Sequence, residues 1–482
     1  MIKIIKCKQW RARKNTIVLH YDNWDDYGYK TTYRINYYDK DGNSVWESSI
    51  QIYCTRLDED GSGGGKVDEY LPSEIAKLDD SFCSLGCDMN FYSGLKKALP
   101  KDYLDILNRL NDLAYNEKRW NQFKKYTGVQ KSLLRSSSSI KAREEAFAIL
   151  ENNFIKEKNL SFSYRTRIPY SDIIVSLNFL FNKKADLPHR INAIVGKNGT
   201  GKTHILNNLA EDLSGFKLEE FDDNAFERGK RPSFDKVISV SYSAFDPFKK
   251  LKGQNSLNSY VYCGIQSEKG TLKLNEIQDN FWKSLETIKK RDRYEQWKRI
   301  ITELFAEENY NITSQIDESR MRDINWSSGQ NVLISSMTEV VAKIDKESII
   351  LFDEPELHLH PNAIANVMRM FNKILEEFNS YAIIATHSPI ILQEIPSNNI
   401  IVLERIDNQP FVRRPEIECF GENISLITRD IFDVTSKESY YQAFFLKMKE
   451  TGKTKEQIEK LFEYNLGLNA LIYLETLYKQ EK

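Results

Sequence analysis

The chain has 482 residues, with 68 lysine and arginine residues against 69 aspartate and glutamate residues, and 41% of it is hydrophobic. This length and composition are typical of an ordinary globular protein with about two to four structural units. The balanced charge excludes a polybasic nucleic-acid binder, so any contact with DNA or RNA must come from local patches.

The amino-terminal residues and the apolar runs argue against export and membrane insertion. Cys7 to Arg11 follow the first six residues, where a secretory signal would continue as an apolar stretch. The most apolar runs, such as Ile349–Phe352, are far shorter than the roughly 18 residues of a spanning helix. The cysteines are scattered, which is typical of reduced thiols. We therefore expect a cytoplasmic protein without a membrane partner.

The first 60 residues have the composition of β-strands. Thr16–Tyr21 and Thr31–Tyr38 are rich in β-branched and aromatic residues, and the turn-like segment Asp39–Asn43 follows. This pattern predicts an antiparallel hairpin or meander. We assign residues 1–60 as a β-rich amino-terminal part of the lobe that starts near residue 160.

A helical pattern follows a flexible junction at Gly61–Gly65. Apolar residues such as Tyr103, Leu107 and Leu110 have helical spacing, although the serines from 136 to 139 interrupt it. We interpret residues 66–158 as a helical insertion.

Residues 160–415 alternate predicted strands with predicted helices, which favours an α/β domain with a mostly parallel sheet. We divide this part of the chain into a first lobe at 160–255, a helical lobe at 256–325 and a third segment at 326–415. A mostly helical docking segment is expected at 416–482. The predicted strands are 173–181, 191–195, 236–242, 348–352, 381–385 and 399–403, and the predicted helices are 204–213, 275–308, 331–342 and 363–378.

A glycine-rich loop follows the predicted strand at 191–195. Gly196–Thr203 fits the pattern G-x-x-x-x-G-K-[ST], whose backbone amides cradle phosphate at a helix amino terminus. Lys202 would reach the β- and γ-phosphates of ATP, and Thr203 would hold Mg²⁺. An accidental glycine-rich turn is the weaker alternative, because eight positions match in the right context. The predicted nucleotide-binding residues of this loop are Gly196, Asn198, Gly199, Gly201, Lys202 and Thr203.

The apolar run Ser348–Phe352 ends in the carboxylates Asp353 and Glu354. In α/β sheets ligands bind at the carboxyl ends of the strands. Asp353 would orient Mg²⁺, and Glu354 would polarise the attacking water as a general base. A solvated strand end explains such a pair equally well by itself, but the phosphate loop favours the catalytic interpretation.

Two more segments complete a pattern of four. Trp326–Gln330 precedes the helix predicted at 331–342, and Ala385–Pro389 follows the strand predicted at 381–385. In order and spacing, the four segments resemble the ATP-binding-cassette (ABC) ATPases, with Walker A at the glycine-rich loop, the signature at Trp326–Gln330, Walker B ending at Asp353 and Glu354, and the switch histidine at His387. The resemblance covers residues 190–405 and implies an ABC-type P-loop ATPase head.

The resemblance implies a catalytic pocket that two protomers share. In ABC ATPases the signature of one protomer contacts the γ-phosphate bound by the other, and Ser327, Gly329 and Gln330 match the contacting positions. His387 would contact the γ-phosphate beside Glu354. We therefore expect a homodimer or a higher homo-oligomer that ATP joins and hydrolysis loosens. The alternatives are a serine-rich helix cap at the signature and a structural histidine at the strand end.

The chain departs from the ABC pattern at three points. Trp326 and Ser328 stand where the usual signature has leucine and glycine, which would slow hydrolysis. No Q-loop glutamine is evident after the strand that ends at Tyr242. The aromatic residue that would stack on adenine is also unassigned, with Tyr164 and Tyr170 as candidates.

Two further regions narrow the resemblance. Glu354–Pro361 is similar to soluble ABC ATPases related to the overcoming-lysogenization-defect (OLD) nucleases and to chromosome-maintenance heads. Phe82–Tyr92, Leu107–Ala114 and Lys131–Ser137 resemble the amino-terminal region of the PtuA-type ATPases of bacterial Septu and Septu-like retron antiphage systems. This resemblance implies a homo-oligomeric ATPase that regulates a separate HNH nuclease subunit, PtuB. An ordinary helical insertion on an ABC head is the alternative.

A nuclease centre is not expected within this chain. None of its six histidines lies beyond His387, so an HNH or anticodon-nuclease centre has no place in the carboxyl-terminal segment. The basic clusters Lys249–Lys252 and Lys289–Arg293, the second with Tyr294 and Trp297 nearby, are candidate contacts to DNA or a retron RNA, or else solvated helix faces. Two other functions stay open: a DNA-binding maintenance or scaffolding ABC ATPase without a nuclease partner, and the energising subunit of a transporter.

Overall fold

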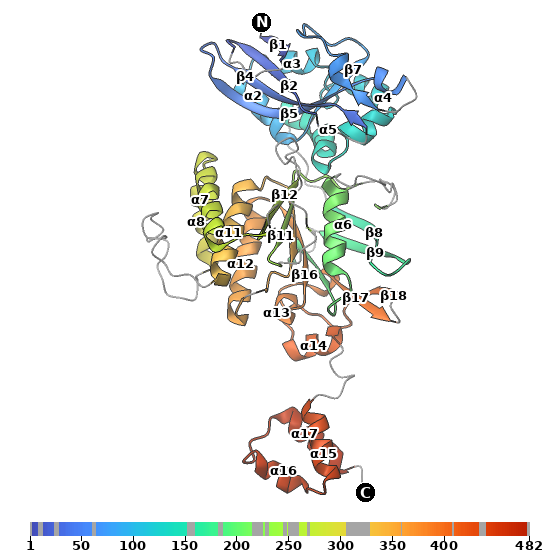
Figure 1. Ribbon diagram of the computed structural model, residues 1–482, viewed down its shortest axis with the longest axis vertical. Coiled ribbons are helices and arrows are strands. Elements are labelled where there is room, and N and C mark those ends of the chain that lie inside the picture. Colours follow the sequence, from blue (N-terminus) through green and yellow to red (C-terminus); the bar gives the residue numbers. More distant parts are fainter. Residues whose placement is uncertain are drawn as a thin grey trace. The chain divides into compact units, whose positions relative to one another are not determined.

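The computed structural model spans residues 1–482 and separates into two compact units, Met1–Glu422 and Asn423–Lys482 (Figure 1). In the described ranges, no helix combines the length and the hydropathy needed to cross a membrane. The residues that the structure describes are 2–7, 13–23, 28–59, 64–151, 160–181, 187–214, 225–226, 231–243, 248, 260–267, 270–304, 328–357, 359–406, 409–432 and 440–479.

The first unit begins with a five-stranded sheet in the order β1-β2-β4-β5-β7. The pairs from β2 to β7 are antiparallel, which confirms the predicted meander, and β1 pairs with β2 in parallel. β7 lies within the stretch predicted to be helical. The strands are β1 (Lys3–Lys6), β2 (Thr16–Tyr21), β4 (Thr32–Tyr38), β5 (Ser44–Cys54) and β7 (Phe82–Gly86), and a short pair is formed by β3 (Tyr29–Lys30) and β6 (Gly65–Lys66).

Helices cover this sheet and share one hydrophobic core with it, which runs from Ile2 to Leu150. The structure therefore differs from the expected boundary near residue 60, because strands and helices on both sides of Gly65 bury their apolar side chains together. No strand of this sheet joins the larger sheet that follows. The helical elements are α1 (Arg56–Glu59), η1 (Val67–Glu69), α2 (Met89–Ala98), α3 (Tyr103–Arg109), α4 (Glu117–Phe123), η2 (Val129–Leu133) and α5 (Ser137–Leu150).

A seven-stranded sheet forms the centre of the first unit, in the order β12-β11-β15-β16-β10-β17-β18. All neighbours are parallel except β17 and β18, which confirms the predicted α/β fold with a mostly parallel sheet. β12 and β18 were not predicted. The strands are β10 (Ile191–Val195), β11 (Val237–Ser241), β12 (Tyr260–Gly264), β15 (Ile349–Asp353), β16 (Tyr381–Thr386), β17 (Ile400–Ile406) and β18 (Gln409–Arg413).

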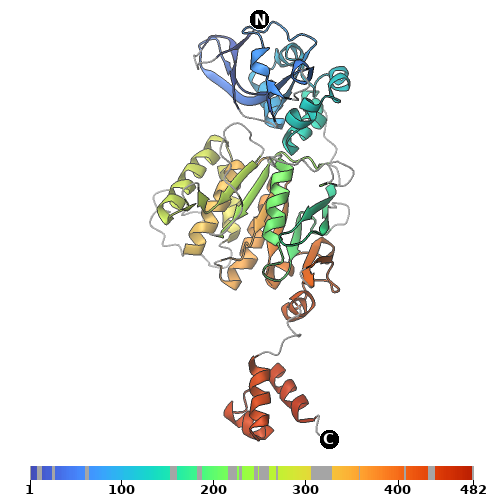
Figure 2. The ribbon, with the colours of Figure 1, turned by 45° about the vertical axis from the view of Figure 1, so that its right-hand side comes forward.

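Both faces of this sheet are covered, which explains why its central strands are apolar without interruption. On one face, Ile349 and Leu351 share a core with α6 (Lys202–Ser214) and with the hairpin of β8 (Leu160–Arg167) and β9 (Ile174–Phe181). On the other face, the Phe352 ring lies 5.5 Å from the Phe371 ring of α12 (Pro361–Glu377). Figure 2 shows the sheet between these two layers.

The helical lobe consists of α7 (Leu274–Lys290) and α8 (Tyr294–Leu304), which lie beside α11 (Ser328–Lys343) and α12 (Figure 1). The buried Trp297 of α8 donates a hydrogen bond of 3.0 Å from Nε1 to Thr338 Oγ1 of α11. This contact fixes the lobe on the helix that follows the signature segment. The small elements of this unit are β13 (Gln266–Ser267), β14 (Gly270–Thr271), α13 (Pro389–Leu392) and η5 (Ser397–Asn399).

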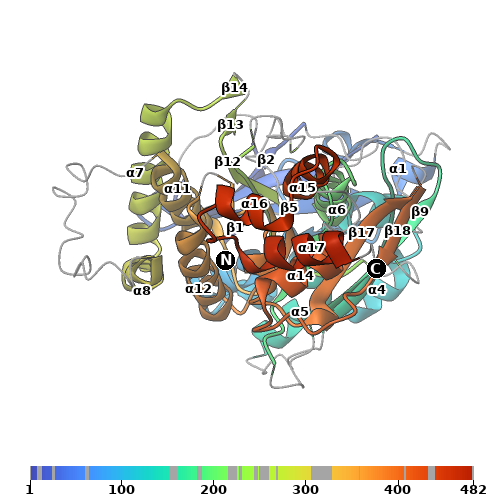
Figure 3. The ribbon, with the colours of Figure 1, turned by 90° about the horizontal axis from the view of Figure 1, so that it is seen from below.

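The second unit is helical in its described part, as the sequence predicts. Its core is small and is centred on the fully buried Phe445, Ile458 and Leu474. Each of these three residues comes from a different helix, so the three helices that carry them form one bundle (Figure 3). The helices are α14 (Ile424–Phe432), α15 (Tyr440–Glu450), α16 (Lys455–Leu461) and α17 (Leu468–Lys479).

Candidate active site

The candidate site lies where β10, β15 and β16 end at one edge of the central sheet. The register pairs Val195 of β10 with Thr386 of β16, and Asp353 of β15 with Ala385. Because the three strands are parallel and adjacent, the segments after their carboxyl ends meet at this edge. The glycine-rich loop, the carboxylate pair and the switch histidine are thereby brought together from distant parts of the chain.

The conformation of the phosphate loop requires its glycines. A Cβ atom at Gly196 would clash with the carbonyl oxygen of Leu403. Gly199 and Gly201 have φ angles of +78° and +105°, in the left-handed region that disfavours other residues. A side chain at Gly201 would also come within 2.5 Å of Ile168. These close approaches explain the glycines of the motif, while Asn198 is exposed at the tip of the loop.

The side chain of Lys202, the first residue of α6, is buried and folds over the loop. Its Nζ atom donates to the carbonyl oxygens of Gly196 at 3.1 Å and Lys197 at 3.3 Å, and lies 2.7 Å from Nε2 of His387. Burial lowers the pKa of Lys202 to about 8, although the nearby carboxylates, first of all Glu354, act in the opposite direction. The charge of this ammonium group therefore depends on its surroundings more than that of an exposed lysine does.

Thr203 and Asp353 form the pair expected at a magnesium site. The Thr203 hydroxyl donates to Oδ2 of Asp353 at 2.8 Å and lies 3.1 Å from Oδ1. Asp353 is almost completely buried. A hydroxyl and a carboxylate are oxygen ligands of the kind that Mg²⁺ prefers. Among the described residues, no cluster of three or more His, Cys, Asp or Glu side chains is placed to bind a metal. The pair therefore fits an ion that takes its other ligands from phosphate and water.

Glu354 has an unusual backbone conformation at the end of β15. Its φ angle is +48°, which costs a non-glycine residue on the order of 1–2 kcal/mol. Its amide donates to the carbonyl oxygen of Ala385 at 2.8 Å, so the end of β16 holds it in place. Its Oε1 atom lies 3.4 Å from Nε2 of His387. His387, and then the charge of Lys202, hold the pKa of Glu354 below its ordinary value, so the carboxylate is ionised near neutral pH.

His387 Nε2 thus lies between an ammonium group and a carboxylate, at 2.7 Å from Lys202 and 3.4 Å from Glu354. The atom can accept a hydrogen bond from Lys202 or donate one to Glu354, but it cannot do both at once. His387 can therefore exchange Lys202 for Glu354 as its hydrogen-bond partner, which suits a site whose charges change during a reaction.

The signature segment is only partly described. Trp326 and Ser327 lie outside the described residues, and α11 begins at Ser328 with Gly329 and Gln330 in its first turn. No hydrogen bond between described residues joins Gly329 to the phosphate loop. The structure therefore gathers Walker A, Walker B and His387 within one chain and does not add the signature to them.

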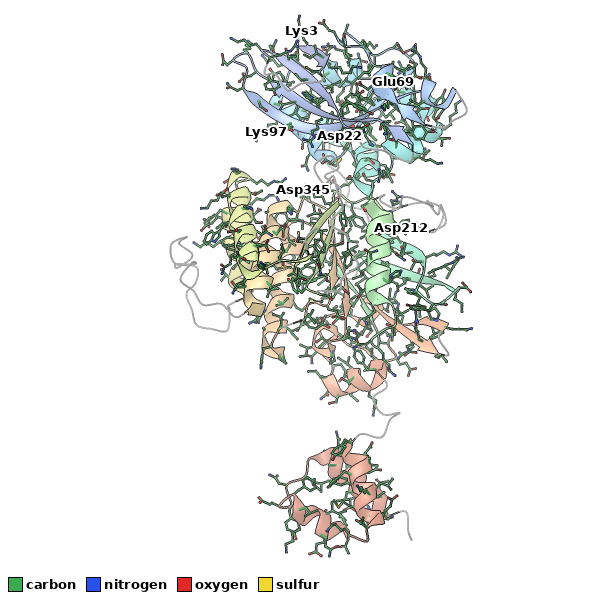
Figure 4. All side chains as sticks on the ribbon, viewed as in Figure 1. Lys3, Asp22, Glu69, Lys97, Asp212 and Asp345 are labelled. Carbon is green, nitrogen blue, oxygen red and sulfur yellow. The ribbon has the colours of Figure 1, made fainter. Side chains whose placement is uncertain are left out.

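The two aromatic candidates for adenine binding differ in exposure. Tyr164 is fully buried, and its hydroxyl donates at 2.7 Å to Asp212, which Figure 4 labels. Its ring is therefore not accessible for stacking on adenine. Tyr170 lies in the turn between β8 and β9 and is 89% exposed. Ile168, two residues before it, packs against Gly201 of the phosphate loop. Tyr170 is therefore the exposed candidate of the two, and Ile168 brings the start of its turn to the phosphate loop.

Two residues of the basic cluster at Lys289–Arg293 form ion pairs within the protein. Arg291 and Arg293 form ion pairs with Asp345 at 3.2 and 3.3 Å (Figure 4 labels Asp345). Trp297, the neighbouring aromatic residue, is buried. Lys289 and Lys290 are exposed, so for these two residues nucleic-acid binding stays a prediction. The other cluster, Lys249–Lys252, lies outside the described residues.

Two polar residues with side-chain contacts near this edge of the sheet do not belong to any of the four predicted motifs. Gln266 is the first residue of β13, two residues after the end of β12, and its Nε2 atom lies 3.5 Å from the carbonyl oxygen of Ser243. The aromatic strand Tyr260–Gly264 before it was the signal that could have located it. Glu356 accepts hydrogen bonds from the Thr386 hydroxyl and from the amide of His387. No local sequence pattern predicts these two hydrogen bonds.

Comparisons with known proteins agree with an ATPase. The family model of the AAA ATPase domain matches residues 216–392, which contain β15, β16 and His387 and begin after the phosphate loop. The chain is 26% identical to protein ea59 of Escherichia phage lambda, over 97% of this chain and 95% of that protein.

Two relatives have names from bacterial defence. Septu protein PtuA of Bacillus thuringiensis is 30% identical over 27% of this chain and 33% of its own length. The retron Vc95 probable ATPase of Vibrio cholerae serotype O1 biovar El Tor is 25% identical over 22% of this chain and 23% of its own length. This chain therefore spans a third or less of these two relatives, whereas it spans nearly all of the phage protein.

Among solved structures, the ADP conformation of an ATP-binding cassette of an ABC transporter covers 58% of this chain and 97% of its own length, with 13% identity and a TM-score of 0.30. The matched ATPase domain and these partial matches support an ATP-binding ATPase, and part of the chain is similar to the PtuA-like ATPases.

Proposed function

We propose that the chain is an ABC-type ATPase that binds and hydrolyses ATP at the interface of two heads and thereby regulates a separate HNH nuclease in antiphage defence. One observation carries the catalytic part of this proposal. Lys202, the Thr203–Asp353 pair, Glu354 and His387 meet at one edge of a parallel sheet. The relatives named PtuA and retron Vc95 ATPase support the defence role.

In the proposed reaction, the amides of the phosphate loop and the ammonium group of Lys202 bind the phosphates of ATP. Thr203 and Asp353 would hold Mg²⁺, which would supply neutralising charge at the β- and γ-phosphates. The position of Lys202 at the start of α6 supports this role, because it lies at the amino terminus of the helix behind the loop.

Glu354 would act as the general base. Its carboxylate is ionised, lies beside His387, and is separate from the Thr203–Asp353 pair. When phosphate draws Lys202 away, Nε2 of His387 would be released from this contact and, in the form that carries a proton on Nε2, could donate to the γ-phosphate. The Lys202–His387 hydrogen bond of 2.7 Å thus gives ATP binding a direct effect on the catalytic histidine.

The second head would supply the remaining contacts. Ser327, Gly329 and Gln330 of the facing protomer would bind the γ-phosphate, as the resemblance to ABC ATPases implies. Tyr170 is the proposed stacking partner of the adenine, on the basis of its exposure beside the phosphate loop. The homodimer or higher homo-oligomer that this arrangement requires is part of the proposal.

The nuclease activity is assigned to a partner subunit. The second unit exposes large apolar side chains on its helices, which suits docking to the nuclease or to another subunit. These exposed residues are Tyr440, Leu461, Tyr464, Leu468 and Ile472. We do not expect this chain to cut DNA or retron RNA by itself, and any nucleic-acid contact would be made by the assembled complex.

A purification from the native host tests the proposal, with the wild type compared with Glu354→Gln and Lys202→Ala. The Glu354→Gln variant should bind ATP but lose at least about 100-fold in kcat, because it keeps the site and loses the base. Lys202→Ala should lose nucleotide binding. ATPase rates and equilibrium binding of nucleotide are the measurements. Ordinary turnover by Glu354→Gln would contradict the assignment of the base.

The proteins that co-purify with the wild type distinguish the candidate functions. An HNH nuclease that accompanies the wild type supports the proposed function, and a membrane protein would instead indicate a transporter. A DNA-binding maintenance or scaffolding ATPase, the second candidate, predicts DNA and no nuclease. The phage protein ea59, similar over nearly the whole chain, keeps this candidate open, because the defence relatives match only a third of it or less.

A further inference from the structure

Glu356 lies in the turn after β15 and is hydrogen-bonded to the segment that carries the switch histidine. Its Oε1 atom accepts from the Thr386 hydroxyl at 2.8 Å and from the backbone amide of His387 at 2.7 Å. The Thr386 oxygen in turn accepts from the amide of Ser388 at 2.9 Å. One carboxylate oxygen therefore organises the backbone of three consecutive residues.

These hydrogen bonds begin where the strand ladder stops. β16 ends at Thr386, and its last ladder partner is Val195 of β10. Beyond this point the backbone of His387 has no sheet neighbour to fix it, and the carboxylate of Glu356 takes that role. Hydrogen bonds to an ionised acceptor are shorter and about twice as strong as neutral ones. The carboxylate of Glu356 therefore holds the segment Thr386–Ser388 in place.

The same turn also holds the proposed base. The Glu354 amide donates to the Ala385 oxygen at 2.8 Å, and the Leu357 amide donates to the Glu354 oxygen at 3.0 Å. Two residues of one turn, Glu354 and Glu356, thus bind consecutive residues at the end of β16. The carboxylate of the base and the imidazole of His387 consequently belong to one hydrogen-bonded assembly, which sets their separation of 3.4 Å.

The second oxygen of Glu356 supports a role for the charge itself. Oε2 is buried and has no hydrogen-bond partner among the described residues. A buried acceptor without a partner is destabilising by about 1–3 kcal/mol. The unpartnered Oε2 atom lowers stability, so stability alone does not explain why a carboxylate stands at this position. The negative charge also acts on Lys202, beside which His387 lies.

We propose that Glu356 is a positioning residue for ATP hydrolysis, which sets the place of His387 relative to Glu354 through its hydrogen bonds to Thr386 and to the His387 amide. This inference rests on the proposed function of the site. Glu356 itself touches neither Lys202 nor Thr203 through any hydrogen bond among the described residues. Its charge acts on Lys202 less than those of Glu354 and Asp353 do, so its removal should change turnover much more than nucleotide affinity.

Steady-state hydrolysis by Glu356→Ala, Glu356→Gln and Thr386→Val tests the inference. Glu356→Ala should lower kcat by about tenfold or more and leave nucleotide affinity within about threefold, because an error of about 1 Å in a catalytic group can cost 100-fold. Glu356→Gln retains an acceptor oxygen and should recover part of the rate. Adding Thr386→Val to Glu356→Ala should lower the rate by less than Thr386→Val does in the wild type, since the two changes share the hydrogen bond between Thr386 and Glu356.

Glu376→Ala, which changes an exposed carboxylate of α12, is the matched control and should hydrolyse ATP at the wild-type rate. Thermal unfolding of each variant distinguishes a displaced His387 from a protein that has failed to fold. An unchanged kcat in a folded Glu356→Ala protein would overturn the inference, and so would a loss confined to nucleotide affinity.

A second readout does not depend on hydrolysis. The imidazole nitrogens of ¹⁵N-histidine-labelled protein give few signals, because the chain has six histidines, and His387→Gln identifies the signal of interest. Glu356→Ala should shift that signal, whereas Glu376→Ala should not. A wild type that binds ATP without turnover would contradict the proposed function, and the His387 signal would still decide for or against the positioning role.

Discussion

The buried position of Lys202 determines both its hydrogen bonds and its pKa. Its ammonium group lies within hydrogen-bonding distance of two loop carbonyls and of His387. Burial disfavours the charged form, and the carboxylates of Glu354 and Asp353 only partly offset this effect. The lysine proposed to bind phosphate is therefore held close to its deprotonation point near pH 8.

The pH dependence of nucleotide binding follows from this pKa. In the nucleotide-free protein Lys202 deprotonates as the pH rises through about 8, whereas bound phosphates should raise its pKa. The complex then holds more protons than the free protein above pH 8, so affinity for ATP should fall there by up to about tenfold per pH unit. Calorimetry with a non-hydrolysable ATP analogue between pH 7 and 9.5 measures both the affinity and the proton uptake.

Lys202→Arg is the matched variant for this titration. Its guanidinium group stays charged throughout the range, so the fall in affinity above pH 8 should disappear even if the absolute affinity is lower. A wild-type affinity that stays constant from pH 7 to 9.5 would contradict the shifted pKa.

At the scale of elements, the serine run before α5 starts a helix. Ser136 caps α5: its Oγ accepts from the Ser139 amide at 3.2 Å, and its own amide donates to the Ser139 Oγ at 3.2 Å. The Ser137 hydroxyl then donates to the carbonyl oxygen of Leu213, near the end of α6, at 2.8 Å. The serines that interrupt the apolar pattern thus both begin α5 and attach it to the helix behind the phosphate loop.

Removing the cap should loosen the first turns of α5. Ser136→Ala should cost about 1 kcal/mol, so amides of that helix should exchange with solvent about fivefold faster. Hydrogen exchange followed by mass spectrometry on α5 peptides measures the change. Ser136→Thr keeps the hydroxyl and should exchange like the wild type. Equal exchange in Ser136→Ala and the wild type would show that the cap contributes nothing to helix stability.

At the scale of the whole molecule, buried charges join the amino-terminal region to the central sheet. Lys141 of α5 forms ion pairs with Asp235 at 3.2 Å and Glu347 at 2.6 Å, just before β11 and β15 begin. Asn90 of α2 donates to Asp345 at 2.9 Å. These contacts lie at the amino ends of the strands, the edge opposite the candidate site. Burial raises the pKa of Asp235 to about 7, although Lys141 acts against it.

The Lys141 pairs should be required for this junction. Lys141→Met leaves two carboxylates without their cation, and the loss of one partner of a buried pair costs about 3–5 kcal/mol. We expect a lower unfolding temperature and faster proteolysis between residues 150 and 160, with unchanged ATP affinity. The exposed Lys97→Met is the control and should behave like the wild type. Unchanged stability in Lys141→Met would mean that apolar packing alone holds the junction.

Local patterns predicted most of the central fold. The strand at Ile191–Val195 was predicted with its observed bounds, and those at 349–353 and 381–386 within one residue of theirs, because apolar runs with glycine or carboxylate ends are local signals. β7 was missed, since five residues within a stretch of helical spacing give too short a signal. β12 was missed because Tyr260–Gly264 was read with the helical lobe that follows it.

The sequence by itself determined the phosphate loop, the carboxylate pair and the alternation of strands and helices, because each depends on residues that are neighbours in the chain. Only the tertiary structure decided the partners of the charged side chains. Arg291 and Arg293 pair with Asp345, and Glu356 binds Thr386, across intervals of 30 residues or more. Such partners are selected by strand register and helix packing, and a buried charge is stable only where the fold brings it an opposite charge or a donor.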